Sequence, residues 1–86
     1  MVDSSPIEFP LVYPLKAIGH NADDFEEFIV SVVQTHAPLS ARTVTIRPSR
    51  GGKYLAVTVT FVADSREQLD AIYQQLSSSK RVLVAL

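Results

Sequence analysis

The stretch Tyr54–Ala63, YLAVTVTFVA, decides the fold of this chain. Large apolar side chains occupy every second position, and smaller or more polar ones lie between them: Leu55, Val57, Val59 and Phe61 against Tyr54, Ala56, Thr58 and Thr60. A period of two is typical of a strand that buries one face. The stretch therefore predicts a strand with one side on a core and the other side open.

A partner strand is expected directly before it. Residues Arg42–Arg47 also alternate, which turns Val44 and Ile46 inward. The connecting segment Pro48–Lys53 contains Gly51-Gly52, and glycine accepts the positive φ of a tight turn. The two strands should form a hairpin.

An amphipathic helix is predicted on each side of this hairpin. The first is Asn21–His36, with Asn21 and Asp24 at N-cap and N3 spacing and Ala37-Pro38 at its end. The second runs from Ser65 to about Ser77, with Ser65 and Gln68 as a capping box. Their apolar residues fall on one face at 3.6 residues per turn: Phe25, Phe28, Ile29, Val32 and Val33, then Leu69, Ile72, Tyr73 and Leu76.

Two further strands, one before the first helix and one after the second, complete the pattern: Tyr13–Ile18, which Gly19 should end, and Val82–Leu86. The order β-α-β-β-α-β predicts an α+β, ferredoxin-like sandwich. Right-handed crossovers give a four-stranded antiparallel sheet of order 4-1-3-2 with both helices on one face. We expect residues 1–11 to form a flexible N-terminal arm and residues 12–86 to form a single ferredoxin-like domain.

Composition narrows the function. The 86 residues include 8 basic and 9 acidic side chains and no cysteine. These counts exclude disulfides and thiolate metal sites, and they make nucleic acid an improbable partner. His20 and His36 lie at opposite ends of the first helix, too far apart to share a metal, so we expect no metal and no cofactor. No apolar run reaches the roughly 20 residues of a membrane span. A cytoplasmic protein with no membrane partner is the expectation.

The predicted topology brings basic residues to one end of the sheet, where the first strand ends and the hairpin turns. The candidate ligand- or partner-binding residues are Gly19, His20, Asn21, Arg47, Arg50 and Lys53, with Lys80 and Arg81 nearby. Residues 42–63 carry four basic side chains and no acidic one. Cations and glycine-rich backbone suit a carboxylate or phosphate. The alternative is a solvated turn whose charges keep edge strands from pairing.

No residue set indicates catalysis, because the serines lie in loops and caps without a paired base. We therefore predict no enzyme activity and no catalytic residue. An RNA-recognition module is the alternative function: Tyr54 offers one stacking ring on the open face, whereas Ala56 and Thr58 offer none. That face is mildly apolar, which makes a homodimer through the sheet face a further expectation; its residues are Pro14, Ile18, Tyr54, Ala56, Thr58, Leu83 and Ala85.

The strings FPLVYPLKAIG, VVQTHAP, TIRPSRGGKYLAVTVTF and RVLVAL resemble the YbeD-like family of small bacterial proteins of unknown function, over roughly residues 8–86. That family is similar in fold to ACT regulatory domains, which bind amino acids near the loop after the first strand, often at dimer interfaces. Gene neighbourhood associates the family with lipoate metabolism. The resemblance implies a regulatory or adaptor domain that binds a protein partner or a small polar metabolite. Gly19 matches the glycine of the ACT loop, but Ala17-Ile18 stand where ACT domains often have an Asp.

Overall fold

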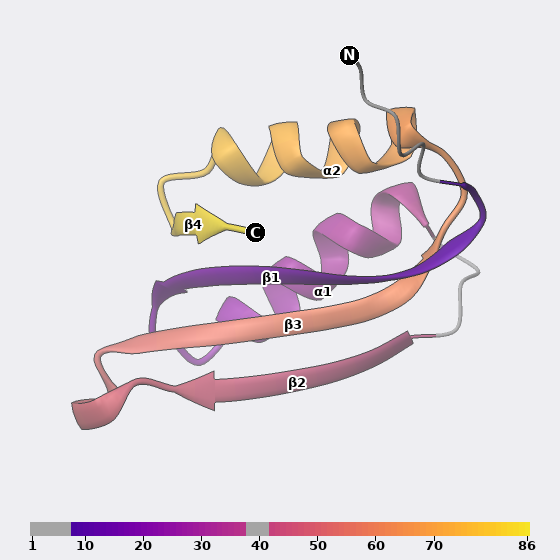
Figure 1. Ribbon diagram of the computed structural model, residues 1–86. Helices are drawn as coiled ribbons and strands as arrows, with labels where there is room; N and C mark the ends of the chain where they lie inside the picture. The colour runs from indigo at the N-terminus through magenta and orange to yellow at the C-terminus, as the bar shows by residue number, and fades with distance from the viewer. Residues whose placement is uncertain (1–7, 38–41) are drawn as a thin grey trace, which may run out of the picture.

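The computed structural model describes residues 8–37 and 42–86. Its elements are β1 (Leu11–His20), α1 (Phe25–His36), β2 (Arg42–Pro48), the 3-10 turn η1 (Arg50–Gly52), β3 (Tyr54–Ala63), α2 (Arg66–Ser77) and β4 (Val82–Ala85). The strands form one antiparallel sheet in the order β2-β3-β1-β4, and both helices cover the same face (Figure 1). The predicted α+β fold and sheet order are confirmed. Most of the expected arm, residues 1–7, lies outside the described residues, as does Pro38.

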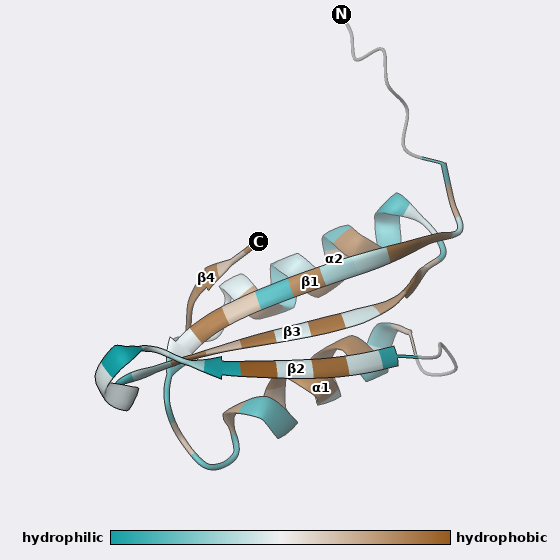
Figure 2. Cartoon of the chain, turned by 60° about the horizontal axis from the view of Figure 1, so that its bottom comes forward, coloured by the Kyte–Doolittle hydropathy of each residue, from teal (hydrophilic) through white to brown (hydrophobic). Residues whose placement is uncertain are grey.

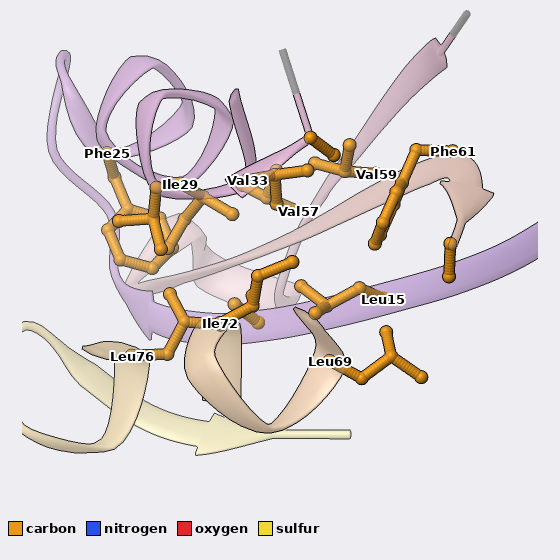
Figure 3. Close-up of a cluster of buried hydrophobic side chains, with 14 of the residues drawn as sticks. Leu15, Phe25, Ile29, Val33, Val57, Val59, Phe61, Leu69, Ile72 and Leu76 are labelled. Atoms are coloured by element: carbon orange, nitrogen blue, oxygen red, sulfur yellow. The ribbon is translucent and has the colours of Figure 1, made fainter. Parts of the chain in front are cut away.

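The core lies between the sheet and the two helices. Every second residue of β3 is buried, as its alternation predicts, and these side chains meet Phe25, Ile29, Ile72 and Leu76 of the helices (Figure 3). Burying each such side chain stabilises the fold by about 1.5–3 kcal/mol. β3 pairs with β1 from Leu11↔Ala63 to His20↔Tyr54. That pairing fixes which residues share the opposite, open face of the sheet.

The N-termini of the two helices differ in how well the sequence predicted them. At α2, the Ser65 hydroxyl accepts a hydrogen bond from the backbone N–H of Gln68 at 3.1 Å, which confirms the predicted cap. At α1, the predicted cap is wrong: the helix begins at Phe25, and Asp24 makes no side-chain cap hydrogen bond. The Asn21 amide instead donates to the carbonyl of Gly52, 3.0 Å away. A tertiary contact therefore replaces the local cap.

Gly19 does not end the first strand, because β1 continues to His20. Gly19 is buried near the end of β1, an inner strand, where it pairs with Leu55 of β3 on one side and Val82 of β4 on the other. A Cβ at this position would overlap the carbonyl oxygen of Arg81 and lie 2.6 Å from Cζ of Phe25. The close approach of three elements, rather than a turn, therefore requires glycine here.

The open face has one change from the predicted set. The β1–β4 register shifts between Ile18 and Gly19, so that Ile18 pairs with Val84. Val84 therefore lies on the open face. The prediction was wrong for Ala85, which pairs with the buried Ala17 and packs against the core.

The helices cover the edge strand β2 only in part. Ile46 pairs with the buried Val57 and so lies on the helix-facing side, as predicted, yet it is 47% exposed. The helices make most of their contacts with β1, β3 and β4, so that Ile46 of β2 stays exposed, whereas Val44 of the same strand is half-buried and packs against the core. Figure 2 shows the two apolar positions of β2 on this edge strand. A side chain of this edge strand can therefore point toward the helix side of the sheet and still be exposed to solvent.

We expect Gly19→Ala to lower the free energy of unfolding by about 1–3 kcal/mol, the usual cost of forcing a methyl group into filled space. Urea denaturation followed by circular dichroism measures it. The control is Gly51→Asn: Gly51 has φ 83° and open space around it, and asparagine tolerates that conformation. An unfolding midpoint for Gly19→Ala equal to that of the wild type would contradict the close approach at Gly19.

Candidate functional site

The end of β1 is fastened to the hairpin turn by two hydrogen bonds from one residue. The backbone N–H of Asn21 donates to the carbonyl of Lys53 at 3.0 Å, and its side-chain amide donates to that of Gly52, also at 3.0 Å. The predicted turn glycines do adopt positive φ, 83° at Gly51 and 74° at Gly52. The predicted site residues are thereby brought to one end of the sheet.

A shallow pocket of about 300 Å³ lies beside this turn on the open face. We call it the rim pocket; its lining residues are Ile18, Arg47, Pro48, Ser49, Arg50, Tyr54 and Ala56. Its floor follows from strand register: Ala56 pairs with Arg47 of β2 on one side and with Ile18 of β1 on the other. The small methyl group of Ala56 leaves space between these longer neighbours.

The charge around the rim pocket is positive. Arg47, Arg50 and Lys53 are all exposed, and none of them forms an ion pair within the described ranges. The ammonium nitrogen of Lys53 lies 5.5 Å from the ring centroid of Tyr54, and the His20 ring lies 5.3 Å from the same centroid. The pocket combines cationic groups with an apolar floor. Such a combination can bind an anion that also carries an apolar part.

The six predicted site residues fall into two groups. Arg47 and Arg50 line the rim pocket, and Lys53 and His20 contact its Tyr54 wall. Gly19 is buried by its neighbours, and the Asn21 amide is bonded to the turn. These two residues therefore support the structure around the rim pocket and do not line it.

The site residues predicted from sequence did not include five that line the rim pocket: Ile18, Pro48, Ser49, Tyr54 and Ala56. Alternation had placed Ile18, Tyr54 and Ala56 on the open face. The cross-strand register, which sets Ala56 beside both Ile18 and Arg47, is the information that would have assigned these residues to the same site as Arg47.

Arg81 lies near this end of the sheet but is already engaged. Its guanidinium bonds the carboxylate of Asp24, with Nη2 2.6 Å from Oδ1, and its carbon lies 5.0 Å from the Phe28 ring centroid. The hydrogen bond and charge of Arg81 hold the pKa of Asp24 below its ordinary value of 3.8. This cation is therefore neutralised and does not add to the charge of the rim pocket.

No group of three or more histidine or acidic side chains within residues 8–37 and 42–86 is arranged to hold a metal ion. In the same part of the chain, neither helix has the length and apolar character needed to cross a membrane.

We expect the Asp24 carboxyl to titrate below 3.8 in wild type and to return toward that value in Arg81→Gln. Because the folded-state pKa is lowered, the stabilisation from this pair is present above the unfolded pKa and is lost as pH falls through the folded value. Side-chain carboxyl NMR measures the titration. Arg66→Gln, at an exposed cation on α2, is the control and should leave Asp24 unchanged. An unaltered Asp24 titration in Arg81→Gln would contradict the pairing.

Comparison with known proteins assigns the family. The family model described as "Protein of unknown function (DUF493)" matches residues 4–86. UPF0250 protein RSc0326 of Ralstonia nicotianae is 46% identical over 83 residues, which cover 95% of this chain and 86% of that protein. UPF0250 protein NE1487 of Nitrosomonas europaea is 39% identical over the full length of both chains.

The solution structure of protein HP0495 from H. pylori has the same fold. It superposes with a TM-score of 0.76 over 98% of this chain and 91% of that one, at 17% sequence identity. At that identity the likeness concerns the fold alone. The family match spans nearly the whole sequence and confirms the resemblance described above: the chain belongs to the DUF493/UPF0250 family, the YbeD-like small bacterial proteins of unknown function.

Proposed function

We propose that this protein is a non-catalytic regulatory or adaptor domain whose rim pocket binds the anionic group of a small polar metabolite or of a protein partner. The observation that carries the proposal is a set of three cations at an apolar-floored pocket, Arg47, Arg50 and Lys53, that form no ion pair with any residue the structure describes. Exposed cations that the fold leaves without an acidic neighbour are available to an external anion.

The chemistry of the pocket suits a carboxylate or a phosphate. An arginine guanidinium binds either group through two parallel hydrogen bonds, and Arg47 and Arg50 both line the pocket. Each exposed ion pair contributes only about 0–1 kcal/mol. Affinity must therefore also come from burying an apolar part of the ligand on Ile18 and Ala56, at about 25 cal/mol per Å².

This requirement defines the ligand class: an anionic head with a short apolar body. Amino acids, small carboxylic acids and an acidic peptide segment meet it. Lipoate, a carboxylate on an apolar chain, also meets it, which agrees with the metabolic context that the family resemblance implies.

The hydrogen bonds of the hydroxyl groups support the proposal of a non-catalytic domain. Within the described ranges, the serine and threonine hydroxyls that form hydrogen bonds all bond to backbone groups, for example Ser49 to the N–H of Tyr54 at 3.0 Å. None of these contacts pairs a hydroxyl with a histidine or carboxylate that would activate it. RNA binding through Tyr54 remains the alternative, and the experiment below includes it.

We expect a small anion with an apolar body to shift the amide signals of Ile18, His20, Arg47, Arg50 and Tyr54 saturably in a two-dimensional NMR titration. Pooled amino acids, short carboxylic acids that include lipoate, and phosphorylated acids are the probes. A short RNA is tested separately at two salt concentrations. RNA-induced shifts that fall with salt and disappear in Tyr54→Ala would favour the alternative function. A spectrum that none of these probes perturbs would remove small molecules and RNA as ligands of this pocket.

Reversing two charges tests the pocket directly. The double variant Arg50→Glu with Lys53→Glu should keep its fold, because both side chains are exposed. It should raise the dissociation constant of an anionic ligand or partner by about tenfold or more, since attraction becomes repulsion. Arg66→Glu is the matched control on a different surface. A folded double variant that binds as tightly as the wild type would exclude these two residues from the site.

A further inference from the structure

A groove runs between α1 and β2, on the side of the sheet opposite the rim pocket. It measures about 690 Å³, and its walls include Asp23, Glu26, Glu27 and Val30 from the α1 side and Arg42 and Val44 from β2. Within residues 8–37 and 42–86, β2 pairs with β3 alone, which leaves the groove open at the sheet edge. Exposed Ile46 lies on the same side of β2.

The outer edge of β2 presents free backbone groups in a definite pattern. The N–H of Ser49 donates to the carbonyl of Tyr54 at 2.9 Å, and antiparallel pairs alternate between bonded and non-bonded residues. Counting back from Ser49, the residues Arg47, Thr45 and Thr43 bond β3. Arg42, Val44 and Ile46 therefore direct their N–H and carbonyl groups away from the sheet.

The side chains of these same residues lie on the helix-facing side. Arg42, Val44 and Ile46 pair with Phe61, Val59 and Val57, all of which are buried beneath the helices. One surface of β2 thus combines unpaired backbone groups, an apolar centre and a cation at its first residue. Such an edge is a template for a further strand.

We propose that the strand added here is β2 of a second copy, in antiparallel pairing about a two-fold axis at Thr45. This register joins the two sheets into one. It sets Val44 of each copy opposite Ile46 of the other, so that their outward N–H and carbonyl groups bond and their side chains cover one another. Arg42 then faces Pro48 of the other copy and donates its N–H to the Pro48 carbonyl. Proline has no N–H to return a bond to the Arg42 carbonyl, so the pairing between the two copies ends at this pair.

Charge complementarity selects a second copy of this chain as the occupant. α1 begins at the end of the sheet where β2 finishes, because the turn before α1 is bonded to Gly52 and Lys53. Asp23 precedes α1, and Glu26 and Glu27 are in its first turn, so these acidic residues lie at that end of α1; they line the groove together with Val44 and Arg42 of the same copy. In the antiparallel register, Arg42 of the second copy arrives at that same end, and the two-fold axis repeats the contact.

Sedimentation of wild-type protein from micromolar to about millimolar concentration tests the proposal. We expect a concentration-dependent dimer. Hydrogen exchange at the amides of Val44 and Ile46 should slow as concentration rises, whereas that of Thr45, already bonded to β3, should not change. A monomer throughout this range, or exchange at Val44 and Ile46 that is independent of concentration, overturns the proposal.

Two matched lysine variants locate the interface. Ile46→Lys should weaken the dimer by at least about tenfold, since an unpaired charge would enter the apolar contact between copies. Val84→Lys changes a residue of similar exposure, 44% against 47%, on the open face, and should leave the dimer intact. A dimer that survives Ile46→Lys but is lost in Val84→Lys forms through the open sheet face and overturns the β2 pairing.

A charge exchange tests the complementarity without changing the apolar contact. Arg42→Glu and Glu27→Arg should each weaken the dimer, and the double variant should recover most of the wild-type affinity. Amide spectra of each variant at low concentration establish that the monomer is folded. Failure of the double variant to recover affinity, with both single variants weakened, would exclude the Arg42–α1 contact and the register built on it.

Discussion

The burial of one face of β3 is the constraint on which the other features depend. Because Leu55, Val57, Val59, Phe61 and Ala63 must lie against the helices, the intervening residues face outward. The antiparallel pairing of β3 then aligns Ile18, Ala56 and Arg47 in one row across the open face. A pocket with an apolar floor and a cationic wall is the result. The same pairing turns Val44 and Ile46 toward the helix side, where Val44 packs against the core and Ile46 stays exposed.

The parts of the fold that were predicted from sequence rest on local periodicity. β3, the hairpin turn and α2 with its Ser65 cap each carry their signal within a dozen residues, and topological rules then gave the sheet order. The start of α1 was not predictable in this way, because Asn21 bonds Gly52, which is 31 residues away. Ala85 and Ile46 show the same limit. The shift in the β1–β4 register turns Ala85 toward the core, and α1 does not cover Ile46, so that it stays exposed.

The candidate site divides along the same line. The cations of the hairpin were predicted because they share one turn, and any ferredoxin-like topology brings that turn beside the end of the first strand. The floor of Ile18 and Ala56 depends on which residues pair across three strands, which no local pattern specifies. Gly19 and Asn21 were correctly placed at this end of the sheet. Their contacts show that they support the site: one permits close packing, and the other fastens the turn.

The fastening of the turn has a thermodynamic consequence. Ser49 and Gly52 bond within the turn, and Asn21 bonds it to β1, so the backbone that carries Arg50 and Lys53 is ordered before any ligand arrives. Binding at a preorganised site loses little conformational entropy from the main chain. Only the rotamers of the long cationic side chains remain to be fixed, at about 0.5–1.5 kcal/mol each. A site with few and exposed contacts can therefore retain most of the free energy that those contacts supply.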